Sequence, residues 1–240
     1  TDVTAIGNAI VDVVTTADED FLTDQGIEKG AMTLINAEQL QSLLPKTHEA
    51  KIISGGSAAN TIVAISMLGG SGAYIGKVKN DAAGNAFKRD LKDLGVSYTT
   101  ASNSSGPATA QCLVFVTGDA QRSMATYLGA CVSLEPSDID AKMIEASKVI
   151  YLEGYLWDPP EAKEAIRKAI KLAHSTNSKV ALSLSDAFCV NRYRAEFLDL
   201  VSNQVDILFA NESEIISLYQ VGNINGALDA IPDNGSIAAI

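Results

Sequence analysis

Residues that could bind a polar ligand are concentrated in residues 52–60, which read Ile-Ile-Ser-Gly-Gly-Ser-Ala-Ala-Asn. This segment predicts a short strand, a glycine turn and a helix. Gly55 and Gly56 carry no Cβ, so a ligand can approach the backbone closely. Ser57 is a candidate N-cap, and Asn60 falls on the first helical turn, where free N–H groups can meet a polar ligand. The alternative interpretation is a tight strand-to-helix connection with a solvated Asn60.

A second candidate pair follows the first predicted strand, residues 3–6. If the chain stays extended, Asn8 and Asp12 share one face. An amide beside a carboxylate can clamp vicinal hydroxyls, since the carboxylate accepts and the amide accepts or donates. Alternatively, Asp12 is a solvated loop acid and Asn8 a turn residue.

Asn211 and Glu214 follow an apolar stretch at residues 205–209. Their spacing is that of a helix capping box. The same oxygen atoms suit Mg²⁺ held through its waters, because Mg²⁺ prefers oxygen ligands and keeps part of its hydration shell. The capping role and the metal role are compatible.

Three further side chains occur at predicted turns or strand ends. Arg122 lies in the turn at residues 118–123, from which a guanidinium could grip a phosphoryl group. Tyr155 and Phe188 each follow a core strand and could stack on a flat ligand. A solvated arginine and aromatic residues at the edge of the core are the alternatives.

The composition restricts the classes of partner. The chain has 240 residues, 47% of them hydrophobic, and a net charge of −11 from 18 basic and 29 acidic residues. This acidity argues against nucleic acid or an anionic membrane as a partner, and no apolar run approaches the length of a membrane span. Three scattered cysteines and no recognisable signal peptide favour a reducing cytoplasm.

The elements that must position these residues form an α/β pattern. From residue 136 onward, strands that are apolar on both faces alternate with helices, which predicts a doubly wound, mainly parallel sheet flanked by helices. The expected strands are 3–6, 73–76, 148–152, 179–184, 205–209 and 236–240, and the expected helices are 37–44, 82–94, 136–146, 159–175, 190–202, 211–219 and 225–231. Ligands of such sheets bind beyond the carboxyl ends of the strands.

Two stretches break the alternation, residues 10–35 and 96–132. The second stretch reads as a β-meander with extended segments at 96–100, 109–117 and 123–128. We expect both stretches to form a small β-sheet lid over the strand ends, within one α/β domain that spans residues 1–240.

These motifs, in this order, resemble the ribokinase-like (PfkB) carbohydrate kinase family, and its adenosine-kinase branch most closely. The matching segments are GNAIVD at 7–12, GGSAAN at 55–60, IGKVKNDAAG at 75–84, TGDAQRS at 117–123 and VDILFANESE at 205–214. Each segment is short, but together they span nearly the whole chain.

The resemblance implies an ATP-dependent phosphotransferase that acts on the hydroxymethyl group of a nucleoside or sugar, with adenosine as the first candidate. It implies substrate contacts from Asn8, Asp12, Gly56, Ser57, Asn60, Met124, Thr126, Leu128, Tyr155 and Phe188. Arg122 would approach the phosphoryl group from the lid, while Asn211 and Glu214 would organise Mg²⁺ through water.

The family's second signature, D-T-x-G-A-G-D, which supplies the catalytic base, does not occur in these 240 residues. The resemblance therefore implies the N-terminal two-thirds of a kinase, with the general base and the adenine-binding residues outside this sequence. A sugar kinase of the ribokinase or fructokinase type, or a non-catalytic nucleoside- or sugar-binding module, are the alternatives. A nicotinamide-dependent enzyme ranks last, because the first strand is not followed by G-x-G-x-x-G.

Both faces of the predicted lid are fairly apolar. In the family, lids of sugar kinases often pair two chains, and adenosine kinases are often monomers. The sequence therefore leaves open a monomer and a lid-mediated homodimer.

Overall fold

The computed structural model describes residues 1–232 and 235–240. Within these residues, the main sheet has the strand order β12-β11-β10-β9-β1-β5-β6, and every pair of neighbouring strands is parallel. Its strands are β1 (Val3–Ile6), β5 (Gly72–Ile75), β6 (Ser97–Tyr98), β9 (Val149–Glu153), β10 (Lys179–Ser183), β11 (Ile207–Phe209) and β12 (Ile237–Ala239). The chain proceeds from β1 toward β6 in one direction and toward β12 in the other. The strand order therefore reverses at β1, the place where such sheets bind ligands.

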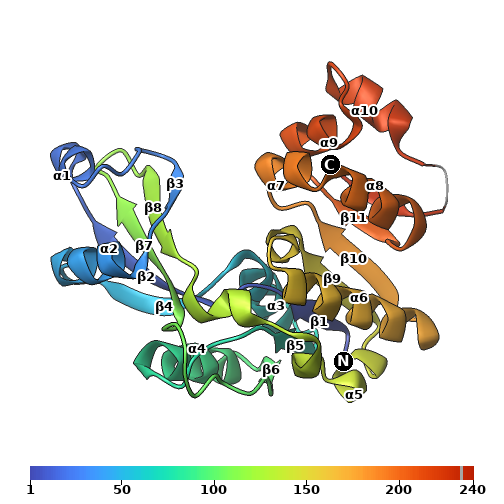
Figure 1. The fold of residues 1–240 in the computed structure, drawn as a ribbon, viewed down its shortest axis with the longest axis horizontal. Helices are drawn as coiled ribbons and strands as arrows, with labels where there is room; N and C mark the ends of the chain where they lie inside the picture. The colour runs from blue at the N-terminus through green and yellow to red at the C-terminus, as the bar shows by residue number, and fades with distance from the viewer. Residues whose placement is uncertain (233–234) are drawn as a thin grey trace.

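Helices cover both faces of this sheet, as the sequence predicts (Figure 1). They are α3 (Ser57–Met67), α4 (Ala82–Asp93), α5 (Ala141–Glu145), α6 (Pro160–Ser175), α7 (Ala187–Arg192), α8 (Arg194–Asn203), α9 (Glu212–Tyr219) and α10 (Ile224–Ala230). Successive residues of β1 belong to different cores: Ala5 packs with residues of α3 and α4, and Ile6 with residues of α6 and α8. This alternation is what a doubly wound sheet requires.

A second, mixed sheet stands beside the first, with the strand order β3-β8-β7-β2-β4. Its strands are β2 (Ile10–Thr16), β3 (Met32–Leu34), β4 (Lys51–Gly55), β7 (Ala110–Val116) and β8 (Arg122–Tyr127), and it is accompanied by α1 (Glu19–Asp24) and α2 (Ala37–Leu43). The two helices lie on the outer side of the sheet (Figure 1), where Leu22 and Leu40 pack against Leu113 and Phe115. The predicted small sheet is thus present, and its closure as a lid stays a prediction.

The membership of the two sheets differs from the expected segments in two places. Residues 51–55 join the small sheet, antiparallel to β2, although the expected lid ranges leave them out. The first expected meander segment instead supplies β6 to the main sheet. The reason is packing, because Val96 is buried and Tyr98 contacts the rings of Tyr74 and Phe87.

Some helix boundaries also differ. The expected helix at 136–146 is a 3₁₀ turn, Pro136–Asp138, followed by α5, because Asp140 caps a new helix. The expected helix at 190–202 is divided into α7 and α8 at Tyr193. Helix α1, capped by Asp18, was not expected. The expected helices at 37–44, 82–94 and 159–175 are confirmed to within one residue.

None of the helices in the described part of the chain combines the length and apolarity needed to cross a bilayer.

Candidate functional site

The two segments predicted to bind hydroxyl groups meet where the chain leaves the main sheet for the small sheet. A Cβ on Gly56 would overlap the backbone oxygen of Asn8, and a Cβ on Gly55 would overlap the carboxyl group of Asp12. Gly56 also has a φ of 95°, a conformation that favours glycine. The glycine turn therefore lies directly against Asn8 and Asp12, so the structure brings the two predicted pairs together.

Asp12 lies in β2, opposite Ile53 of β4 and Cys112 of β7. Burial raises the pKa of its carboxyl from 3.8 to about 6. Burial also raises the pKa of the Cys112 thiol to about 11, with a smaller contribution from Asp12, and the Thr126 hydroxyl donates to the Cys112 sulfur at 3.3 Å. Cys112 was not among the candidate residues, although two-residue alternation places it on the face of Thr126 and Met124.

The predicted contacts from the lid strand share a face of the small sheet. In the ladder, Cys112 pairs with Thr126, Val114 with Met124 and Val116 with Arg122. Alternate residues of β8 point the same way, so these three side chains lie on the Asp12 face, away from α1 and α2. Leu128 lies just beyond β8, half-buried, where a 3₁₀ turn begins.

Ser57 is not the N-cap of α3. The cap is Gly56, which offers no side chain, and Ser57 instead donates its hydroxyl to the Glu153 carboxylate. Asn60 is exposed on the first turn, as expected, with its backbone N–H bonded to Gly56 at 2.9 Å. The cap lies one residue earlier than expected, because the Ser57 hydroxyl binds the Glu153 carboxylate and does not bond to the helix.

Glu153, at the carboxyl end of β9, was missed by the sequence reasoning. It is 2% exposed and accepts the backbone N–H of Asn8 at 2.6 Å as well as the Ser57 hydroxyl. Burial raises the pKa of its carboxyl, and these bonds, with backbone N–H groups of Ser57 and Ala58, oppose that rise. The available signal was an acid directly after an apolar strand, followed by a glycine.

A second group of acidic residues surrounds Tyr155 at the same edge of the main sheet. Burial raises the pKa of its hydroxyl to about 12, and the charges of Asp186, Glu153 and Glu214 add to the effect. Asp186 caps α7 by accepting the N–H of Phe188 at 2.6 Å. The Phe188 ring, 79% exposed, is available for the predicted stacking contact.

Asn211 and Glu214 form the capping box at the start of α9. The Asn211 side chain accepts the N–H of Glu214 at 2.9 Å, and Glu214 accepts the N–H of Asn211 at 3.1 Å. The Asn211 amide also donates to the other Glu214 oxygen at 2.7 Å. Each carboxylate oxygen thus has one protein donor, and burial raises the pKa of Glu214.

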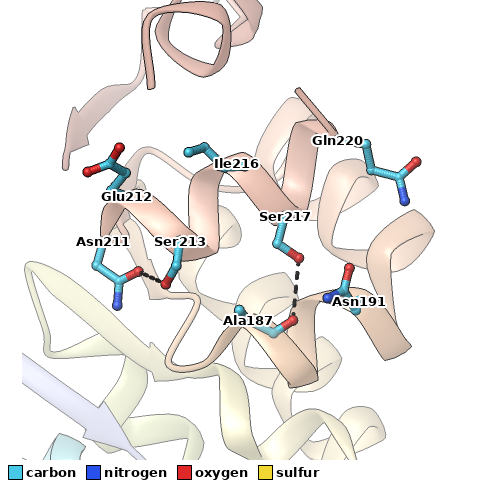
Figure 2. Close-up of a pocket in the computed structure, with 8 residues that line it drawn as sticks. All are labelled: Ala187, Asn191, Asn211, Glu212, Ser213, Ile216, Ser217 and Gln220. Carbon is cyan, nitrogen blue, oxygen red and sulfur yellow. Dashed lines mark hydrogen bonds between the residues drawn. The ribbon is translucent and has the colours of Figure 1, made fainter. Parts of the chain in front are cut away.

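A hollow of about 720 Å³ lies beside this box, between α7 and α9. Figure 2 shows Asn211 and Ser213 at one end of it and Asn191 and Gln220 at the other. The Ser213 hydroxyl donates to the Asn211 side chain at 2.7 Å, so the amide oxygen is held in place at the rim of the hollow.

The described residues contain no group of three or more His, Cys, Asp or Glu side chains arranged to hold a metal ion directly. The oxygen donors of Asn211 and Glu214 nevertheless fit the hydrated Mg²⁺ implied by the resemblance. Each carboxylate oxygen keeps a lone pair after its bond to Asn211, and can accept a hydrogen bond from a metal-bound water.

Comparison with known proteins gives a consistent picture. Residues 2–238 match the family described as pfkB family carbohydrate kinase. A solved structure of an adenosine kinase from Sinorhizobium meliloti is 49% identical, with a TM-score of 0.87, and the match covers 95% of this chain and 70% of that one. A probable sugar kinase from Rhizobium etli is 48% identical, with a TM-score of 0.91, over 99% of this chain and 72% of that one.

Among curated proteins, the adenosine kinase of Saccharomyces cerevisiae is 25% identical over 94% of this chain. The chain spans 69% of that protein's length, and between 37% and 64% of the next four curated relatives.

Proposed function

The chain belongs to the pfkB family of carbohydrate kinases, and we propose that it carries the acceptor site of an ATP-dependent kinase that phosphorylates the hydroxymethyl group of a nucleoside. Adenosine is the leading candidate acceptor. The relative from Sinorhizobium meliloti described as adenosine kinase supports this choice, because it is 49% identical along 95% of the chain.

One observation carries the proposal: the glycine turn packs against Asn8 and Asp12 at the point where the strand order reverses. The glycine turn places the start of α3, with Asn60, near the Asp12 carboxylate, which can accept hydrogen bonds from two hydroxyl groups. A pair of neighbouring ribose hydroxyls matches this set of donors and acceptors. The small-sheet face with Met124 and Thr126 would enclose the rest of the acceptor, and Tyr155, Leu128 and Phe188 would complete the pocket.

Phosphoryl transfer would take place between the small sheet and the carboxyl ends of the main strands. The exposed guanidinium of Arg122 is free to contact the phosphoryl group, while Asn211 and Glu214 would hold the waters of Mg²⁺. Bound Mg²⁺ neutralises the negative charge of the ATP phosphates. The role of this chain is to bind and orient the acceptor, and to exclude water when the small sheet closes.

A sugar acceptor is the second candidate. The probable sugar kinase from Rhizobium etli is 48% identical over 99% of this chain, so overall similarity does not separate the two classes. A nucleoside and a sugar would both present neighbouring hydroxyl groups to Asp12. Only the nucleoside carries a nucleobase, which would contact Thr126, Met124 and Tyr155.

We retain the cytoplasm as the proposed location, since Cys112, Cys131 and Cys189 are all free thiols. We also retain a small-molecule substrate and a monomer or lid-mediated homodimer. One face of the small sheet is occupied by α1 and α2, and the other exposes Met32 and Leu34 at its edge strand.

The proposal is tested by calorimetric titration of this chain with adenosine and with ribose, without ATP. We expect micromolar binding of adenosine that is lost in Asp12→Asn and kept in Asp20→Asn, an exposed acid on α1. Binding of ribose alone would favour a sugar kinase. A folded chain that binds neither compound would contradict an acceptor site formed by these residues.

A further inference from the structure

Two connections between the main sheet and the small sheet converge on Glu153. The chain leaves β1 through Asn8 to enter β2, and it returns from β4 through Gly56 to enter α3. The Glu153 carboxylate accepts from both connections: from the Asn8 N–H with one oxygen and from the Ser57 hydroxyl with the other. Glu153 itself lies at the end of β9, which pairs with β1.

The first turn of α3 needs such a partner. Its N-cap, Gly56, makes no side-chain bond to the helix, and the first N–H groups of a helix have no partner within the helix. The backbone N–H groups of Ser57 and Ala58 interact favourably with the Glu153 carboxylate. An anion at a helix N-terminus is also favoured by the helix dipole. Glu153 thus places a carboxylate from a distant strand at the start of α3, where Gly56 supplies no side-chain cap.

The surroundings of Glu153 leave room for this carboxylate. A Cβ on Gly7 would lie 2.8 Å from a Glu153 oxygen and would also overlap Ala58. The carboxylate is therefore enclosed by the β1–β2 connection and the start of α3, and it is 2% exposed. Its bonds to its own chain distinguish it from Asp12, whose carboxylate faces the small-sheet surface.

We propose that Glu153 is a positioning residue, which fixes Asn8 and the first turn of α3 relative to each other and so holds the acceptor site together at the junction with the small sheet. It acts through the backbone of Asn8 and through Ser57. The consequence for acceptor affinity rests on the proposed function, whereas the structural part of the proposal does not.

The structural part is tested by amide hydrogen exchange of the chain without ligand. In Glu153→Gln, we expect exchange at Asn8, Ser57 and Ala58 to quicken about tenfold or more, because one neutral amide oxygen replaces the two charged oxygens that accept from both connections. Tyr74→Phe is the matched control, since it removes a buried neighbouring hydroxyl that has no hydrogen-bond partner within the described residues. Unchanged exchange at these amides in Glu153→Gln would overturn the proposal.

Ser57→Ala keeps the proposal testable if Glu153→Gln does not fold. It removes one bond to the carboxylate, and we expect faster exchange at the amides of positions 57 and 58 with little change at Asn8. Equal exchange in Ser57→Ala and the unsubstituted chain would contradict the bridge that we infer.

The functional part is tested by titrating each folded variant with adenosine. We expect the dissociation constant to rise about tenfold in Glu153→Gln, in step with the faster exchange, and to stay unchanged in Glu161→Gln, an exposed acid on the first turn of α6. Faster exchange with unaltered affinity would overturn the link to the acceptor site. If the unsubstituted chain binds no adenosine, the proposed function fails, and the exchange result still decides the positioning role.

Discussion

Asp12, a proposed contact of the acceptor, lies in an environment that destabilises its charged form. Its pKa is raised from 3.8 to about 6 by burial, so the folded state binds this proton more tightly than the unfolded state. The protonated carboxyl contributes fully to the free energy of unfolding below pH 3.8, and this contribution is lost as the pH rises through about 6. At neutral pH the charged carboxylate therefore lowers the free energy of unfolding.

We accordingly predict that Asp12→Asn stabilises the ligand-free chain at pH 7.5, with an upper limit of about 3 kcal/mol from the pKa difference. The gain should decrease steadily toward pH 4. Urea unfolding at several pH values measures it, with Asp20→Asn as a control that should show no such trend. A pH-independent difference between Asp12→Asn and the unsubstituted chain would show that burial does not raise the pKa of Asp12.

Gly56 and Gly69 form a matched pair for testing the close approach at the glycine turn. Their φ angles are 95° and 90°, but a Cβ on Gly56 would overlap the backbone of Asn8, whereas a Cβ on Gly69 meets nothing within 4 Å. We predict that Gly69→Ala loses about 1 kcal/mol of stability through backbone strain, and Gly56→Ala at least about 2 kcal/mol more. Denaturant unfolding compares them, and equal losses would mean that Gly56 is required for its φ alone.

At the scale of single elements, the capping box at the start of α9 can be compared with the simpler N-cap of α10. Asn211 makes three bonds with Glu214, whereas Asn223, the N-cap of α10, accepts one N–H from Gly226. We predict a loss of about 1 kcal/mol for Asn223→Ala and about 2 kcal/mol or more for Asn211→Ala, because the buried Glu214 carboxylate also loses its amide donor. Thermal unfolding measures both, and similar losses would mean that the amide bond contributes little.

The helices and strands differ in how well local sequence patterns predict them. Apolar runs and helix periodicity predict the main strands and helices 82–94 and 159–175 closely, because burial on one or both faces is a local property. The sheet to which residues 97–98 belong depends on the packing of Tyr98 against distant rings, and no local pattern contains that.

In the candidate site, too, local sequence marks some residues, whereas distant contacts determine others. The positions of Asn8 and the glycine turn were predictable from element boundaries that the residue types mark, and that of Asp12, inside β2, from the two-residue alternation of an extended chain. Glu153 was not, because its partner Ser57 is 96 positions away in the sequence. The displaced N-cap has the same origin, since Ser57 turns toward that distant carboxylate.

At the scale of the whole molecule, the buried residues fall into separate clusters. Leu113, fully buried, belongs to the cluster beneath α1 and α2, whereas Trp157, the single tryptophan of the chain, belongs to the cluster around α6. The small sheet therefore has its own core. It is joined to the rest of the chain by short connections at residues 7–9 and at Gly56, and by longer ones at residues 99–109 and 128–148. A sheet with a separate core can open locally while the main sheet stays folded. The proposed closure over a substrate would depend on the same independence of the two sheets.

We predict that Leu113→Ala quickens amide exchange in β2, β7 and β8 while moving the unfolding midpoint reported by Trp157 fluorescence only slightly. A large-to-small substitution in a core lowers the free energy of unfolding by about 2–5 kcal/mol. We expect the loss in Leu113→Ala to fall on local opening of the small sheet. Leu182→Ala, in the Trp157 cluster, is the matched substitution and should shift the fluorescence midpoint strongly. If both variants shift that midpoint equally, the two sheets unfold as one cooperative unit, and the proposed closure would then be a rigid rotation about the connections at Asn8 and Gly56.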